Sequence, residues 1–426
     1  PLPLKSEGET YARMNRGIAK AYLARILLQS ASPQFNGNSK YANIRNADGT
    51  PLFPLTYDKN KWELARQAAL SLIKDGNYDL VKVLYESGAN MGEIDPYTSY
   101  KSVFTTSQNK EMIFSFLEDN GTIDKRLAPN SNGGWGGGYN PTQEIVDAYA
   151  MLETGRFPIT GYTDDDRTTP IIDPDAGYQE VGYSQFTNPC EGKERKTYNM
   201  FVGREPRFYL TVMWNRQWYH QAEREVQMMS NEQDGGPTHD APQNGYLNRK
   251  KVSLDQNQRN GIHPYRPGIL YRLGEAYLNY AEALNECDPG NPDILKYLNL
   301  IRERAGMPQY GTGKDSNGFD KIPLNGQDEV REAIYHERRV ELCCENGLRY
   351  LDLRRWKKAE EVLNQPMYGM NFSGTKLSDD PNDDAAFFKR TQYIKRVYER
   401  KFYWYPIYQD QIDKDPTLVQ APFWDK

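Results

Sequence analysis

The sequence predicts a mainly α-helical protein built from tetratricopeptide-like helix pairs, with a loop-rich second half that carries short strands. Three observations predict this fold class. Apolar residues recur at helical spacing in several segments of about fifteen residues. These segments come in pairs, and a tight turn joins the two helices of one pair. Between Arg156 and Pro267, Pro, Gly and Asp interrupt more than a hundred residues that contain few long periodic segments.

The first helix pair is expected near the beginning of the chain. Tyr11–Ser30 has Ala, Leu and Ile on one face, and Ser32 before Pro33 ends it because a residue that precedes proline avoids the helical region. Asp58–Asp75 repeats the pattern, and Gly76 stands where a helix C-terminus favours a left-handed residue. We expect the two helices to pack antiparallel.

The middle of the chain is less regular. Lys110–Leu117 is a short apolar run that predicts a strand, and Asn140–Leu152 predicts a helix. Between them, Ser131–Tyr139 is a glycine-rich segment around one tryptophan. It has neither the lysine nor the strand–loop–helix context of a phosphate-binding loop, so we expect a flexible or tightly turned surface loop. Arg207–Trp214 predicts a further strand.

The clearest helical pattern follows. Leu270–Leu284 and Asp293–Ala305 each show one apolar face, and a turn rich in Pro and Gly joins them. Asp328–Asn346 and Arg349–Leu363 predict another pair. With the pair at the beginning of the chain this makes three, the smallest number expected to stack stably.

Composition excludes several functional classes. The 53 Lys and Arg against 58 Asp and Glu give a formal net charge of -5, which speaks against a nucleic-acid partner. The four cysteines form no CxxC motif. No apolar run is long enough to span a membrane. Pro1–Ser6 lacks the features of a signal peptide, so we expect a mature or partial chain with any targeting or lipidation segment upstream.

The densest charged segment, His336–Trp356, carries Glu337, Glu341 and Glu345 on one helix face. Such carboxylates hold metals in some helix bundles. Interleaved arginines favour ion pairs between packed helices instead, and no HExxH motif is present. In the same segment we assign four residues to buried ion pairs: Arg349, Asp352, Arg354 and Arg355.

No catalytic motif stands out, so we expect a protein that is not an enzyme. GxSxG, Walker A and dinucleotide-binding motifs are absent from the sequence. Three acidic segments, Asp164–Asp166, Asp315–Asp320 and Asp379–Asp384, lack EF-hand spacing and are expected to be solvated loops. We expect no cofactor, with bound calcium left open.

Aromatic rings interspersed with Asn, Gln, Asp and Arg mark the loop-rich region. Stacking rings beside polar side chains suit a sugar, whose apolar C–H face packs on a ring while its hydroxyls form hydrogen bonds. Packing in the core is the alternative role for each ring. Trp214 is a weaker candidate because it adjoins Arg204–Phe208. The candidate ligand-binding residues are Trp135, Tyr139, Tyr162, Tyr178, Tyr183 and Trp218.

Several segments together resemble the SusD/RagB family of nutrient-binding lipoproteins of the Bacteroidetes outer membrane. The matching segments are Gly17–Leu28, Asn140–Leu152, Arg204–Phe208, Ile269–Asn285, Leu298–Pro308, Glu337–Trp356, Tyr405–Ile407 and Gln420–Trp424. The chain departs from the family pattern at Cys343 and Cys344, at Glu205 and at Tyr408. None of these positions affects the logic of the fold.

The resemblance implies one SusD-like domain over residues 1–426 that lacks the N-terminal portion of the family. Within it we expect a helical repeat part (1–130), a loop-rich ligand-side part (131–267), a helical repeat core (268–365) and C-terminal loops packed on that core (366–426).

The resemblance also implies a non-enzymatic function. The protein would capture a nutrient, usually an oligosaccharide, at the extracellular face of the outer membrane, and would act as the lid of a SusC-type TonB-dependent transporter. An N-terminal lipid anchor outside this chain would attach it to the membrane. Oligopeptide capture in a similar uptake system, a helical scaffold for protein interaction and a glycosidase remain alternatives.

Overall fold

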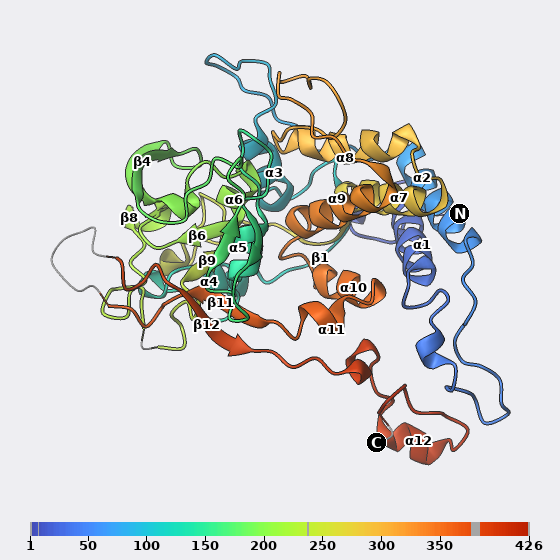
Figure 1. Ribbon diagram of the computed structural model, residues 1–426. Helices are drawn as coiled ribbons and strands as arrows, with labels where there is room; N and C mark the ends of the chain where they lie inside the picture. Colours follow the sequence, from blue (N-terminus) through green and yellow to red (C-terminus); the bar gives the residue numbers. More distant parts are fainter. Residues whose placement is uncertain (1, 7, 237, 376–383, 425–426) are drawn as a thin grey trace.

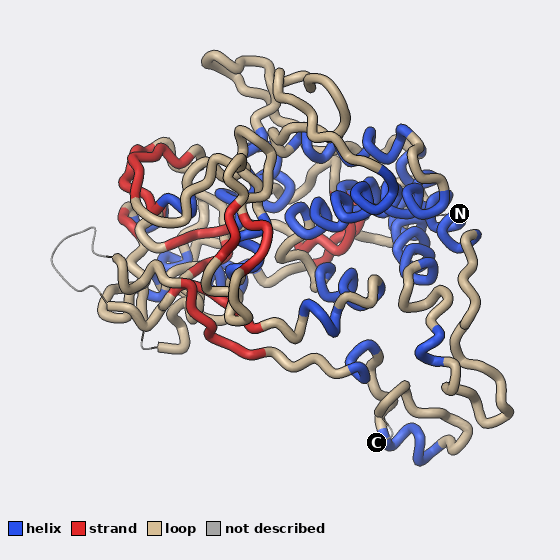
Figure 2. The backbone as a smooth tube through the Cα atoms, viewed as in Figure 1, coloured by secondary structure: helices blue, strands red, loops and turns tan. Residues whose placement is uncertain are grey.

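The computed structural model describes residues 2–6, 8–236, 238–375 and 384–424. Helices gather on one side of the molecule, and hairpins and long loops gather on the other (Figure 1). Colouring by secondary structure shows the same division, with strands almost confined to the loop-rich side (Figure 2). The structure is therefore mainly helical with a loop-rich part, as the sequence predicts.

The helical side is a layer of long helices. In chain order they are α1 (Arg16–Ala31), α2 (Asn60–Lys74), α7 (Leu273–Cys287), α8 (Pro292–Arg304) and α9 (Gly326–Glu341). Helix α2 packs against α1 and α7, and α7 packs against α8 and α9. The shared core contains many alanines and aliphatic residues, with Ala21, Ala65, Ala276 and Leu298 almost inaccessible to solvent, and tyrosines such as Tyr280 pack among them. The helix pairs predicted at the beginning of the chain and at α7 and α8 are both present.

Polar side chains fix where the long helices begin. The Asn15 side chain accepts a hydrogen bond from the Ile18 amide at the start of α1. Asn291 caps α8 in a similar way, and Pro292 occupies its first turn. The last predicted helix pair is shorter than expected. Helix α9 ends at Glu341, and the segment after it is divided into α10 (Leu348–Arg355) and α11 (Ala359–Val362).

The other α-helices within the described residues are short. They are α3 (Pro96–Thr105), α4 (Asn120–Leu127), α5 (Gln143–Ala148), α6 (Pro206–Thr211) and α12 (Gln409–Lys414). Single 3₁₀ turns lie at Gly8–Thr10, Ser39–Tyr41, Asn130–Asn132, Asn199–Phe201, His220–Ala222, Gln258–Asn260 and Arg400–Tyr403.

The strands in the described part of the chain form six antiparallel pairs. These are β1 (Met112–Phe116) with β10 (Gly268–Arg272), β2 (Ile159–Tyr162) with β3 (Pro170–Ile172), β4 (Tyr183–Asn188) with β5 (Lys193–Tyr198), β6 (Val212–Trp214) with β9 (Tyr246–Asn248), β7 (Trp218–Tyr219) with β8 (Arg224–Glu225), and β11 (Pro366–Met370) with β12 (Arg390–Lys395). The β1–β10 pair joins a segment of the first third of the chain directly to α7.

The strand predicted at Arg207–Trp214 is wrong over most of its length. Residues 206–211 form α6, and only the last three residues of the predicted segment are extended. Pro206 stands in the first turn of this helix, where the fixed φ of proline is already helical and its missing N–H removes no hydrogen bond. Alternation of apolar residues alone could not reveal that helix start.

A second core holds the loop-rich side together, and large rings dominate it. Phe201 and Trp214 stack with centroids 4.9 Å apart, and Phe208 lies against the same tryptophan. The segment after β11 contributes Phe388, which stacks on Tyr198 at 4.2 Å and an interplanar angle of 7°. The C-terminal residues therefore complete this core.

The C-terminal end also contacts a loop from the beginning of the chain. Trp404 packs against Phe35, Tyr41 and Phe53, with centroids about 5 Å apart. In Figure 1 this segment runs below α10 and α11 toward the loop that follows α1. In the described part of the chain no helix combines the length and apolar character required to cross a membrane.

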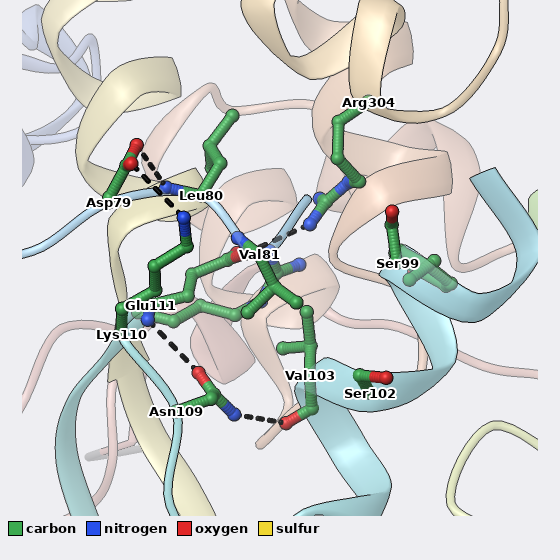
Figure 3. Close-up of polar contacts among 12 residues, drawn as sticks. Asp79, Leu80, Val81, Ser99, Ser102, Val103, Asn109, Lys110, Glu111 and Arg304 are labelled. Carbon is green, nitrogen blue, oxygen red and sulfur yellow. Dashed lines mark hydrogen bonds and ion pairs between the residues drawn. The ribbon is translucent and has the colours of Figure 1, made fainter. Parts of the chain in front are cut away.

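A buried network of charges lies where the helical layer meets the loops. Arg272 pairs with Glu111 at 2.7 Å and with Glu341 at 2.8 Å. Arg304 pairs with the same two carboxylates. Figure 3 shows the contact between Glu111 and Arg304 beside Val81, whose amide also donates to Glu111. Arg207 extends the network to α6 through its 3.0 Å contact with Glu341.

The other two glutamates of the predicted face are also paired. Glu337 accepts from Arg207 and from Arg302, and Glu345 accepts from Arg272 and Lys250. The prediction that these carboxylates form ion pairs between packed elements is confirmed. Burial alone would raise the pKa of Glu341, but the neighbouring arginines hold it well below its usual range.

A second buried cluster lies around Asp352. Its carboxylate pairs with Arg338 at 2.9 Å and with Arg355 at 2.8 Å, and Arg355 continues to Glu282. The ion pairs predicted for Asp352 and Arg355 are confirmed.

Those predicted for Arg349 and Arg354 are wrong. Arg354 donates to the Tyr403 carbonyl and lies over the rings of Tyr350 and Tyr405, because its side of α10 faces the C-terminal segment. Arg349 has no ion pair among the described residues, because its side chain lines a cavity.

Candidate ligand-binding surface

Two of the six candidate residues expose much of their rings on one loop. Trp135 is 46% exposed and Tyr139 is 42% exposed. Both belong to the glycine-rich segment that follows the 3₁₀ turn at Asn130–Asn132 and leads to α5. Rings with this exposure can each offer a surface to a sugar, and the loop places them four residues apart in sequence.

Three glycines of this loop, Gly134, Gly136 and Gly137, lie against neighbouring backbone. A Cβ atom on Gly134 would stand 2.1 Å from the Ala128 carbonyl oxygen, and one on Gly137 would stand 1.8 Å from the His239 carbonyl oxygen. Trp135 itself is held by its amide, which donates to the Lys125 carbonyl at 2.6 Å. The loop is therefore tightly packed, because only residues without a side chain allow this approach. Of the two alternatives from the sequence, the tightly turned loop is the one observed.

Polar groups surround the two rings. The Lys125 ammonium lies 5.2 Å from the centre of the Trp135 ring. The Tyr139 hydroxyl donates to the Cys344 carbonyl at 3.2 Å. Burial, with a smaller contribution from Cys344, raises the pKa of Tyr139 to about 12, so its hydroxyl stays protonated at neutral pH. Asn140 donates to the Gly136 carbonyl and steadies the end of the loop.

Tyr162 and Tyr178 lie elsewhere, around a buried arginine. Arg390 pairs with Asp147 at 2.7 Å and with Glu180 at 2.6 Å. The Tyr162 hydroxyl donates to Asp147, and the Tyr178 hydroxyl donates to Glu180. Tyr178 is only 8% exposed. Both tyrosines thus act as donors within an ion-pair cluster, and the ring of Tyr178 belongs to the second core.

Tyr183 and Trp218 occupy two further places. Tyr183 packs against Tyr198 at 5.4 Å beside a hollow of about 360 Å³. Trp218 lies beside a separate hollow of about 540 Å³, with Lys193 3.8 Å and Arg195 4.5 Å from its ring centre. Trp135 and Tyr139 therefore share one exposed loop (131–139, the ring-bearing loop), whereas the other four candidates belong to other segments. Trp214 is buried in the second core.

Sequence reasoning missed a cavity on the helical side. It has a volume of about 660 Å³ and lies between α9, α10 and residues 155–160. Its lining comes from segments that are far apart in the sequence, so no local motif marks it. The one available signal was the number of arginines on α9 and α10, which we assigned to ion pairs.

The acidic loops have structural roles. Asp164 accepts hydrogen bonds from the amides of Thr168 and Thr169, and Asp315 accepts from the amides of Asn317 and Phe319. Of Asp379–Asp384, only Asp384 lies within the described residues, and it pairs with Arg216. In the described ranges no group of three or more His, Cys, Asp or Glu side chains is placed to hold a metal ion.

The chain is similar to known proteins in both sequence and fold. The family model described as the SusD family matches residues 97–424. The chain therefore belongs to the SusD family, as the sequence motifs indicated. The mainly helical fold with a loop-rich second half is confirmed by solved structures of the same family.

Individual relatives are more distant. The SusD-like proteins P38 and P2 of Formosa agariphila are 38% identical over 103 residues and 36% identical over 122 residues. These matches cover 24% and 28% of this chain, and they span about a fifth of the length of each relative.

Solved structures match over almost the whole chain. The protein BT4246 has a TM-score of 0.74 at 25% identity, with 99% of this chain and 73% of that chain covered. A structure described as a SusD-like carbohydrate binding protein (BF0978) from Bacteroides fragilis has a TM-score of 0.62 at 20% identity, with 98% and 68% covered.

Proposed function

We propose that this protein captures oligosaccharides at the surface formed by Trp135 and Tyr139. The observation that carries the proposal is the exposure of these two rings on a loop that close-packed glycines hold in place. A rigid ring loses little conformational freedom when a sugar stacks on it, so its contact area contributes to affinity. The Lys125 ammonium and the polar groups near Tyr139 provide hydrogen-bond partners for sugar hydroxyls.

The family supports this ligand class, and it extends the proposal to transport. One structural neighbour is described as carbohydrate binding. We propose that the protein hands its glycan to a SusC-type TonB-dependent transporter and closes that transporter as a lid. It would work at the extracellular face of the outer membrane, attached through an N-terminal lipid anchor, and would bind its ligand without hydrolysing it.

Calorimetry with the purified chain against plant, host and microbial oligosaccharides tests the proposal. We expect saturable binding of at least one glycan and no reaction product. Replacing both Trp135 and Tyr139 by Ala should weaken this binding about tenfold or more, because two stacking surfaces are lost. Trp218→Ala is the matched control, since it removes a ring from a different place on the loop-rich side.

Other outcomes would redirect the assignment. Binding of casein-derived peptides without glycan binding would show an oligopeptide-capture protein. Binding to a transporter without binding of either glycans or peptides would favour the protein-interaction scaffold. Release of shorter sugars would contradict the non-enzymatic role.

A further inference from the structure

The cavity of about 660 Å³ beside α9 and α10 is lined by charged and aromatic side chains that the proposed function does not use. Six of them matter here: Phe157, Tyr335, His336, Arg339, Arg349 and Trp356. Phe157 lies just before β2. Three of the residues belong to α9, Arg349 belongs to α10, and Trp356 directly follows α10. Trp135 and Tyr139 do not line this cavity.

Two of the three arginines that line this cavity, Arg339 and Arg349, form no ion pair within the described residues, unlike the arginines of the buried network. Within the described residues Arg349 has no hydrogen bond and no ion pair, and its side chain lines the cavity. Arg339 donates to the Glu144 carbonyl oxygen at 2.6 Å. The carboxylate of Glu144 itself is taken by Arg396 at 3.0 Å. Burial, and then the nearby charge of Arg339, lowers the pKa of Arg349 to about 10.

Acidic side chains at this cavity are occupied or lie at its outer edge. Asp173 pairs with Arg156 and Glu332 pairs with Lys358, each at 2.7 Å. Glu329 accepts a hydrogen bond from the Asn325 amide. Glu361 is exposed to solvent. Within the described residues neither Arg339 nor Arg349 forms an ion pair, and carboxylates such as Asp352 and Glu144 attract them only from beyond contact distance. An anion placed between the two guanidinium groups would relieve their mutual repulsion.

The rest of the wall is aromatic and apolar. Tyr335 and Trp356 stack with centroids 3.7 Å apart, and Phe157 lies on His336 at the same separation. Burial lowers the pKa of His336 to about 3, so the ring is neutral and donates from Nε2 to the Ala148 carbonyl. Ring edges and aliphatic side chains suit the carbon body of a ligand of several rings, and the volume lies within the range of small-molecule sites.

We propose that this cavity is a second binding site, which takes an acidic saccharide whose carboxylate or sulfate group lies between Arg339 and Arg349. A guanidinium group presents paired N–H donors that match both anions, and a partly buried site strengthens the contact. The anionic group follows from the arginines alone, whereas the saccharide body rests on the proposed function. Because no lining residue is shared with the ring-bearing loop, the two sites can be tested separately.

Calorimetry at fixed ionic strength provides the test. The probes are a galacturonate tetramer, a sulfated galactose tetramer and the uncharged galactose tetramer. We expect at least one acidic probe to bind tenfold or more tightly than the uncharged one, and comparison of the two acidic probes distinguishes carboxylate from sulfate. Arg349→Gln should reduce that binding at least tenfold and weaken its salt dependence. Arg349→Lys should retain part of it, since the charge remains but the paired donors are lost.

Arg354→Gln is the matched control on the same helix, because Arg354 points to the Tyr403 carbonyl instead. It should leave acidic binding unchanged. Equal affinity for all three probes, no binding of either acidic probe, or unchanged acidic binding by Arg349→Gln would overturn the proposal. Binding of a tetraglutamate peptide in place of the acidic sugars would overturn the saccharide assignment. Loss of neutral glycan binding in the Trp135 and Tyr139 variant bears only on the proposed function.

Discussion

The helical layer and the loop-rich side solve the same packing problem with different residues. Helices satisfy their backbone hydrogen bonds internally, so they can approach closely through small side chains such as Ala65 and Ala276. Loops leave wider and less regular gaps, which rings such as Phe201 and Trp214 fill. Large rings are therefore more frequent in the core of the loop-rich side, although tyrosines such as Tyr277 and Tyr280 also pack in the helical core.

Two buried arginines, one on each side, have different kinds of partner. Arg204, on the loop-rich side, donates to the carbonyl oxygens of Met200, Val146 and Tyr149. It thereby satisfies backbone acceptors that no regular element satisfies. Arg304, in helix α8, pairs with the carboxylates of Glu111 and Glu341. Arg204 thus binds backbone, whereas Arg304 joins separate elements through their carboxylates.

The largest effect is expected where the two sides meet, at Glu341. Glu341→Ala should lower the free energy of unfolding by about 3–5 kcal/mol, because it leaves buried arginines without part of their counter-charge. Chemical denaturation measures this change. Asp320→Ala, which removes an exposed partner of Lys314, should have no measurable effect. Equal destabilisation by both variants would contradict the distinction between buried and surface pairs.

Arg204→Met should have the next largest effect and lower the free energy of unfolding by about 3 kcal/mol. The methionine fills much of the same space but leaves buried carbonyl oxygens unsatisfied. The matched control is Arg259→Met, because Arg259 donates to the Ser131 carbonyl at an exposed position. Equal stability of the two variants would show that water satisfies the buried carbonyl oxygens in place of Arg204. It would contradict the structural role given to this arginine.

Acid should weaken the buried ion pairs around Glu341 and Asp352. Burial alone would raise the pKa of Glu341, Glu345 and Asp352, but neighbouring cations lower all three. In the unfolded chain the pKa values of such groups are about 4. Below about pH 5 the unfolded chain therefore binds more protons than the folded one, and the free energy of unfolding should fall as the pH falls. Denaturation at pH 7, 5 and 4 measures the slope, which should be smaller for Glu341→Gln.

The smallest effect on stability is expected in the ring-bearing loop. Gly137→Ala must displace the loop, because its Cβ would collide with the His239 carbonyl. Glycan affinity should fall about tenfold through movement of Trp135 and Tyr139. Gly138→Ala has open space around its Cβ and should bind glycan normally. Calorimetry of the two variants compares them, and identical affinities would show that glycine packing does not position the rings.

Much of the helical side could be predicted from the sequence. The apolar face of Leu270–Leu284 correctly predicted the body of α7, although its first residues belong to β10. The i, i+4 spacing of Glu337, Glu341 and Glu345 among arginines correctly predicted ion pairs. These features depend on local periodicity and charge balance, which a single sequence contains.

The site could be predicted only in part. Nothing in the sequence distinguishes Tyr178, whose hydroxyl is bound by Glu180, from Tyr139, whose ring reaches solvent. Burial of a ring in a loop depends on which distant segment covers it. The sequence likewise gives the charges of Arg349 and Arg354, which led to the prediction of ion pairs. It does not give the direction of each side chain, which depends on the short helix α10.

The position of Glu341 also has a consequence for folding order. It binds Arg207, Arg272 and Arg304, all of which precede it in the chain by between 37 and 134 residues. These arginines cannot be neutralised by this residue until α9 has been synthesised and docked. Long-range contacts of this kind slow folding. A nascent chain that ended before α9 would leave Arg207, Arg272 and Arg304 with only Glu205 and Glu111 as carboxylate partners. We therefore expect the docking of α9 to determine when the whole chain becomes native.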